Sequence, residues 1–154
     1  MVETRIVSKV VAYITHNGRL LVFREPAFPE VGIQVPVGTM EPDETPADAV
    51  LREAEEETGL DTLRIVAFLG AQDRDLRPRG RNVVQRRHFF HLTLDSDALE
   101  TWRHWETSPS EGNVPEIEFE FFWVNIPDGI PQLSGEQDAL LHLIDVHGDS
   151  RGAV

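Results

Sequence analysis

The sequence predicts an α/β protein in which a mixed β-sheet lies between helices. Three observations predict this class. Segments rich in β-branched and aromatic residues flank a central amphipathic helix, a second amphipathic segment lies near the end of the chain, and both helical segments have one apolar stripe that a sheet would cover. A chain of 154 residues suits one ordinary domain, so we expect residues 1–154 to form a single domain.

Six segments rich in apolar, β-branched or aromatic residues predict extended structure. They are residues 5–15, 20–24, 33–35, 63–69, 83–94 and 117–125. The Asn17-Gly18 pair between the first two is a strong hairpin signal, so these two segments are expected to pair. Residues 95–115 have no clear periodicity and predict a long loop. Trp102 and Trp105 within it would either stack on a base or pack over the sheet edge.

Both predicted helices have recognisable start signals. The central helix has Thr45 as its N-cap, Pro46 at its first position and Gly59 as its C-terminal stop. A loop over residues 38–44 leads into it. Ser134 and Gln137 form a capping box in front of the closing segment, whose leucines predict a second helix.

The central helix places three glutamates on a common face. Glu53, Glu56 and Glu57 stand at the offsets i, i+3 and i+4, so their side chains are expected to point in one direction. Three like charges this close repel one another unless a cation binds between them. A site for a divalent metal ion is therefore the first hypothesis.

The overall charge and the absence of cysteine exclude several classes of function. The chain has 27 acidic residues against 14 lysines and arginines, a formal net charge of -13, so neither nucleic acid nor an anionic membrane is an expected partner. Without cysteine there are no disulfides, thiolate metal sites or cysteine nucleophiles. No signal-peptide pattern or apolar run of membrane-spanning length is present, so we expect a cytoplasmic protein. The sequence leaves a homodimer open.

Residues 38–60 carry a long pattern of fixed positions. It consists of Gly38, Glu44 after five residues, Arg52-Glu53 after seven more, and then Ala54, Glu55, Glu56, Glu57, Thr58, Gly59 and Leu60. The pattern resembles the Nudix box, and the chain is identified as similar to the Nudix hydrolase family. Ala54 stands where a larger aliphatic residue is commoner, and Gln34 where tryptophan is frequent. Neither departure affects a metal ligand.

The resemblance implies both a fold and a reaction. The fold would be the Nudix-type α/β/α sandwich, and the reaction hydrolysis of a nucleoside diphosphate linked to another group, with Mg²⁺ or Mn²⁺. The substrate would be a small nucleotide-type molecule. By resemblance, the metal ligands are Glu53, Glu56, Glu57 and the backbone carbonyl of Gly38. Glu44 and Arg52 would form an ion pair that orients the loop against the helix.

The general base and the phosphate-binding residues are less defined by the sequence. Glu53 or Glu56 could take the proton of the attacking water, with Glu53 preferred. Downstream alternatives are Glu116 and Glu120, followed by Glu106 and Glu111.

An arginine-rich segment suggests where phosphate could bind. Six arginines occur between residues 74 and 87, namely Arg74, Arg77, Arg79, Arg81, Arg86 and Arg87. Arg86 and Arg87 are candidates for binding substrate phosphate, and the alternative is a solvated hairpin.

Two other functions are compatible with this fold, namely diphosphate binding without catalysis and isomerisation. A catalytically silent diphosphate-binding domain usually lacks some glutamates of the box, whereas all of them are present here. An isomerase on the same fold typically needs a cysteine, and there is none. The sequence therefore favours the hydrolase.

Overall fold

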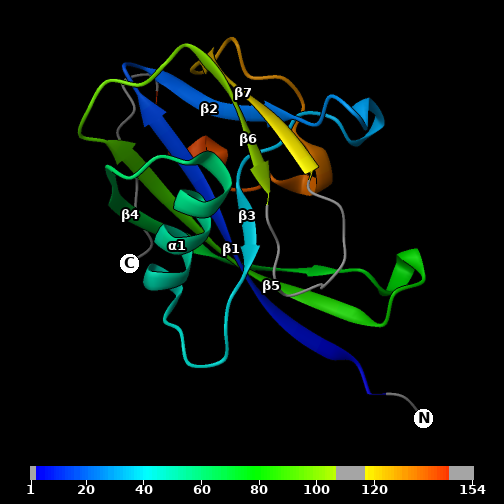
Figure 1. Cartoon of the computed structure of the whole chain (residues 1–154). Helices are drawn as coiled ribbons and strands as arrows, with labels where there is room; N and C mark the ends of the chain where they lie inside the picture. Colours follow the sequence, from blue (N-terminus) through cyan, green and yellow to red (C-terminus); the bar gives the residue numbers. More distant parts are fainter. Residues whose placement is uncertain (1–2, 107–116, 146–154) are drawn as a thin grey trace.

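The computed structural model describes residues 3–106 and 117–145 (Figure 1). Its strands are β1 (Arg5–His16), β2 (Arg19–Arg24), β3 (Val37–Thr39), β4 (Leu63–Asp75), β5 (Val83–Leu94), β6 (Thr101–Glu106) and β7 (Ile117–Asn125). The α-helix of the described part is α1 (Pro46–Thr58), and short 3-10 turns lie at Pro29–Val31, Arg77–Arg79, Ser134–Glu136 and Leu141–Leu143. No helix in these ranges is long and apolar enough to span a membrane.

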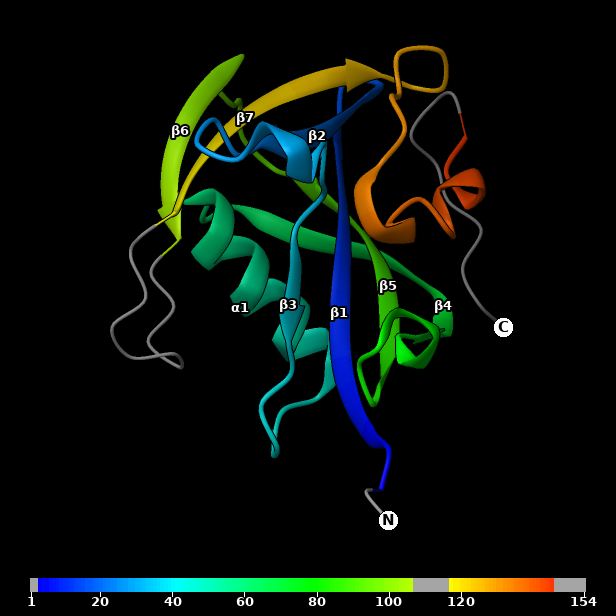
Figure 2. The ribbon, with the colours of Figure 1, turned by 90° about the vertical axis from the view of Figure 1, so that its right-hand side faces the viewer.

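The seven strands form one mixed sheet that divides at β1. The strand order is β4-β5-β1-β2-β7-β6, and β3 also pairs with β1. β1 and β5 are parallel, and every other pair is antiparallel. β3 pairs with the middle of β1, at residues 9–11, whereas β2 pairs with its end, so β2, β7 and β6 diverge from β3 (Figure 2). The predicted α/β class with a mixed sheet is confirmed.

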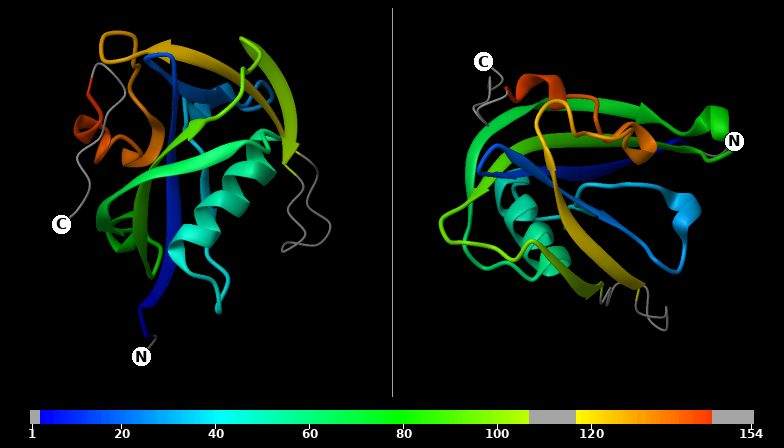
Figure 3. Two further views of the ribbon diagram at one scale, coloured as in Figure 1. Left: turned by 90° about the vertical axis from the view of Figure 1, so that its left-hand side faces the viewer. Right: turned by 90° about the horizontal axis from the view of Figure 1, so that it is seen from above.

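Helix α1 lies in the opening between the two parts of the sheet. It packs on β3, β1 and β4 along its length and meets β6 near its end (Figure 3). Ala49, Val50 and Ala54 are buried against Phe119, Phe121 and other apolar side chains of the sheet. The small size of the three helical side chains lets the helix approach the sheet closely. With its apolar side against the sheet, α1 has its polar side next to β3.

The opposite face of the sheet is covered by residues 126–144, which form 3-10 turns rather than an α-helix. Leu133, Leu140, Leu141 and Ile144 pack there with Tyr13 and Phe89. The predicted closing helix is therefore wrong in type, although its leucines are buried as expected.

The backbone of this segment departs from a right-handed helix near its start. Gly135 and Glu136 both have φ near +59°, a left-handed conformation that interrupts a right-handed helix. The expected capping box does not form, because Gln137 Oε1 instead accepts a hydrogen bond from the backbone N–H of Val35.

Three further elements differ from the sequence-based expectation. The segment 33–35 makes only isolated bridges, and the strand β3 begins two residues later, at Val37, and extends into the predicted loop. β4 continues to Asp75, six residues beyond its predicted end at Leu69. Residues 101–106, predicted as loop, form β6, because they pair with β7 in a regular antiparallel register.

Candidate metal and active site

The ends of α1 are fixed by local contacts that hold its glutamates in place. Thr45 Oγ1 accepts a hydrogen bond of 3.2 Å from the backbone N–H of Asp48, as expected for an N-cap. At the other end the N–H of Gly59 donates to the carbonyl of Glu55. The helix therefore begins and ends where the sequence predicts.

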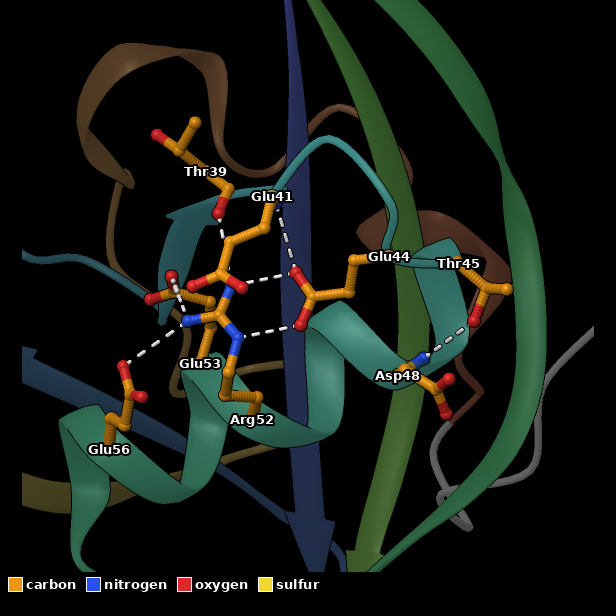
Figure 4. Close-up of polar contacts among 8 residues, drawn as sticks. All are labelled: Thr39, Glu41, Glu44, Thr45, Asp48, Arg52, Glu53 and Glu56. Carbon is orange, nitrogen blue, oxygen red and sulfur yellow. Dashed lines mark hydrogen bonds and ion pairs between the residues drawn. The ribbon is translucent and has the colours of Figure 1, made fainter.

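Arg52 is the centre of a polar network between the loop and the helix (Figure 4). Its Nε and Nη2 donate to the two carboxylate oxygens of Glu44, at 2.6 and 2.8 Å. Nη2 also donates to the carbonyl of Thr39, at 3.2 Å. The hydrogen bonds from Arg52 hold the pKa of Glu44 down, at about 2. The orienting ion pair that the resemblance implies is present.

The same guanidinium contacts two of the candidate metal ligands. Arg52 Nη1 donates to Glu53 Oε1 at 2.9 Å and to Glu56 Oε2 at 3.4 Å. Figure 4 shows both carboxylates turned toward Arg52. One arginine thus links Glu44 of the loop to Glu53 and Glu56 of the helix.

Glu53 lies directly against Gly38 of β3. A Cβ atom built on Gly38 would overlap the Glu53 carboxyl group. Only a residue without a side chain leaves room for this approach of a carboxylate to the backbone. The contact joins two positions 15 apart in the sequence that the resemblance assigns to the same metal site.

The three helical glutamates differ in their surroundings. The Glu53 side chain is 17% exposed and that of Glu56 is 56% exposed, whereas Glu57 is buried. Within residues 3–106 and 117–145, no three carboxylate or histidine side chains are gathered closely enough to hold a metal ion. The helical spacing therefore places the three glutamates on neighbouring parts of α1. It does not by itself bring their carboxylate groups together at one point.

The donor chemistry of this region nevertheless fits a hard divalent cation. Mg²⁺ prefers carboxylate and carbonyl oxygens and keeps several waters, so it does not need a complete protein cage. Glu53, Glu56, Glu57 and the backbone of Gly38 offer oxygen donors of this kind. Arg52 contacts one carboxylate oxygen of Glu53 and one of Glu56.

The two candidate phosphate-binding arginines lie on opposite faces of β5. Successive strand residues point to opposite sides, and Phe90 belongs to the core beneath α1 whereas Phe89 belongs to the other core. Arg86 therefore shares the α1 side and forms an ion pair with Asp73 at 3.0 Å. Arg87 lies on the opposite face and is buried.

The candidate general bases are also separated by the fold. Glu120 of β7 faces away from α1, since its neighbours Phe119 and Phe121 face toward it. Glu120 is bonded to Arg24 and Arg103. Glu111 and Glu116 lie outside the described residues, and of Glu106 only the backbone is described, at the end of β6.

Two residues of β6 contact the C-terminal end of α1. Trp102 Nε1 donates to the carbonyl of Thr58 at 2.8 Å, and His104 Nε2 lies 2.9 Å from the carbonyl oxygen of Glu56. Trp102 thus packs on the helix and sheet, whereas Trp105 is 49% exposed. The sequence drew attention to Trp102 but gave no signal for His104.

Comparison with known proteins supports the fold and gives the family. The model of the NUDIX domain matches residues 5–143. No curated protein is matched by the sequence. Among solved structures, a MutT NUDIX hydrolase from Burkholderia pseudomallei is similar, with a TM-score of 0.61 and 23% identity over 90% of this chain and 97% of that one.

Two further structures have the same fold. A UDP-X diphosphatase has a TM-score of 0.62 and 22% identity, covering 99% of this chain and 68% of that one. The E. coli ORF135 protein has a TM-score of 0.58 and 20% identity, covering 90% of this chain and 88% of that one. At such identities the likeness concerns the fold alone. Because the domain model spans nearly the whole sequence, this chain belongs to the NUDIX family.

Proposed function

We propose that this protein is a pyrophosphohydrolase that uses Mg²⁺ or Mn²⁺ to cleave the diphosphate linkage of a nucleoside diphosphate joined to another group. Family membership supports a hydrolase that acts on nucleoside diphosphate derivatives. The observation that carries the proposal is the placement of Glu53 against Gly38, within hydrogen-bonding distance of Arg52. This arrangement brings carboxylate groups, the backbone of Gly38 and a fixed cation together in one place.

The residues of the site would have two roles, metal binding and positioning. Glu53, Glu56, Glu57 and the carbonyl of Gly38 would hold the metal ion. When bound, that ion neutralises phosphate charge and lowers the pKa of a coordinated water. Glu44 and Arg52 would position the loop and the helix, because their two hydrogen bonds fix both partners in one plane.

Glu53 is the proposed general base. It belongs to a rigid helix, and its carboxylate is close to the backbone of β3, where the metal and the water are expected. Glu120 is a weaker candidate, since it lies on the face away from α1 and is engaged by two arginines. Glu116 stays an alternative prediction.

The decisive experiment is a chromatographic assay that follows release of the nucleotide product from a panel of nucleotide derivatives. The panel should include nucleoside triphosphates, nucleotide sugars and dinucleotides, each measured with Mg²⁺, with Mn²⁺ and with EDTA. The proposal predicts release that requires a divalent metal. Tight binding of one compound without any release would instead support a silent diphosphate-binding domain, and release unaffected by EDTA would contradict the metal mechanism.

A further inference from the structure

Lys9 of β1 and Arg87 of β5 are neighbours on the face of the sheet opposite α1. They are paired residues of the parallel β1–β5 ladder, so their side chains point to the same side. Val11 and Phe89, two residues further along each strand, belong to the core beneath the C-terminal segment. Two basic residues therefore occupy neighbouring strand positions at the border of that core.

Arg87 is a buried cation whose hydrogen-bond partners are neutral. It is only 5% exposed, and its Nη1 donates to the carbonyl of Gly135 at 2.8 Å. Its Nε makes a longer bond of 3.3 Å to Gln85 Oε1. Removing a charge from water is costly unless an opposite charge compensates it.

Arg74 of β4 brings a third positive charge to the same place. Gln72 pairs with Arg87 across the β4–β5 ladder, and Arg74 lies two residues later, on the same face. A Cβ atom on Gly135 would be 3.0 Å from Arg74 Nη1, so the guanidinium lies against the same backbone turn that Arg87 contacts. Two arginines thus meet beside Gly135.

The described residues contain no carboxylate within ion-pair distance of Arg74 or Arg87. The neighbouring arginines of the hairpin are different, because Arg77 pairs with Asp75 at 2.9 Å and Arg86 pairs with Asp73. Burial, reinforced by the charge of Arg74, lowers the pKa of Arg87 to about 10, and Glu136 only partly opposes this. The cluster is therefore a concentration of positive charge in a chain of net charge -13.

Lys9 connects this cluster with the candidate metal site. Its Nζ donates to Thr39 Oγ1 at 2.7 Å, one residue after Gly38. Burial lowers the pKa of Lys9, the charges of Glu53 and Glu57 oppose that effect, and Arg87 adds to it. Lys9 thus contacts the residue after Gly38 on β3 and pairs with Arg87 of β5.

We propose that Lys9, Arg74 and Arg87 form a phosphate-binding site for a second anionic group of the substrate, beyond the diphosphate linkage that is cleaved. This inference rests on the proposed function in that the bound phosphate belongs to a substrate, whereas the site itself consists of the three basic side chains. Bound phosphate would supply the negative charge that Arg74 and Arg87 lack. The guanidinium groups could each donate to its oxygens. Arg86, on the other face and paired with Asp73, is not part of this site.

The test measures binding of inorganic phosphate to the full chain in EDTA, by thermal unfolding at several phosphate concentrations. Potassium chloride at matched ionic strength separates specific binding from screening. Arg74→Gln is the test variant, because Arg74 is partly exposed and its loss does not leave a buried group unpaired. We expect its apparent affinity for phosphate to fall about tenfold.

Arg77→Gln is the matched control, since it removes an arginine of the same hairpin that is already paired with aspartate. Its phosphate affinity should stay within about twofold of the unaltered protein. Equal affinity in the Arg74→Gln variant and the unaltered protein would overturn the proposal. So would the absence of phosphate stabilisation beyond that of chloride. Because the measurement needs neither metal nor turnover, its result is independent of whether the protein is a hydrolase.

Discussion

The indole N–H of Trp102 donates a hydrogen bond of 2.8 Å to the carbonyl oxygen of Thr58, the last residue of α1. The same ring stacks on Phe121 with centroids 5.2 Å apart. The last carbonyls of a helix have no partner within the helix, so a donor from elsewhere stabilises them. β6 therefore fixes the end of the helix that carries Glu56 and Glu57.

Replacing Trp102 by phenylalanine should destabilise the protein by about 1–2 kcal/mol. The ring contact with Phe121 is largely kept, whereas the hydrogen bond to Thr58 is lost and its carbonyl is left without that donor. Urea unfolding measures the change in the free energy of unfolding. Trp105→Phe is the control, because Trp105 is 49% exposed. Equal losses in the two variants would contradict the role given to the Trp102 hydrogen bond.

The ends of α1 could be predicted from sequence because their signals are local. Thr45, Pro46 and Gly59 act through contacts within a few residues, and the structure places them as expected. The glutamate pattern was equally local. What the pattern could not give was the direction of each carboxylate, which depends on Arg52 reaching both Glu53 and Glu56.

The closing segment and β6 could not be predicted because distant contacts determine them. Gln137 meets the backbone of Val35, a partner 102 positions away, instead of capping a helix. β6 is a strand because it pairs with β7, and Trp102 within it is held by α1. Neither contact leaves a periodic signal in the sequence. Which face of the sheet Arg86 and Arg87 each occupy depends on how β5 packs in the folded sheet.

Acidification should remove the contribution of the Glu44–Arg52 ion pair to stability. Hydrogen bonds from Arg52 lower the pKa of Glu44 from 4.5 to about 2 in the folded protein. A lowered folded pKa means that the stabilisation is fully present above pH 4.5 and is lost as the pH falls from there toward 2.

The variant Glu44→Gln tests this pH dependence. It should be less stable than the unaltered protein by about 1–2 kcal/mol near neutral pH, and the difference should shrink as the pH falls through that window. Denaturant unfolding at a series of pH values measures it. A difference that stays constant down to pH 2 would show that Glu44 acts by packing and not by charge.

Gly38→Ala should reduce activity much more than stability. The new Cβ would overlap the Glu53 carboxyl group, which is the flexible end of a side chain and can move away at small cost to the fold. That movement takes the proposed ligand and base from its position. We expect kcat/KM for the best substrate of the panel to fall about hundredfold, with a small change in melting temperature. Normal activity in this variant would mean that the contact between Gly38 and Glu53 is not needed for the reaction.

Glu53→Gln should abolish most of the metal-dependent turnover while the protein stays folded. The amide is nearly isosteric, so the helix and the contact with Gly38 can persist, but it neither accepts a proton at neutral pH nor binds Mg²⁺ as strongly as a carboxylate. We expect kcat to fall at least about hundredfold, with the far-ultraviolet circular dichroism spectrum unchanged.

Glu55→Gln is the matched control, because Glu55 is an exposed glutamate of the same helix outside the proposed ligand set. The kcat of this variant should change less than about twofold. If both variants lose activity equally, the general charge of the helix is responsible. If neither does, the base must be sought elsewhere, with Glu116 the first candidate because Glu120 faces away from α1.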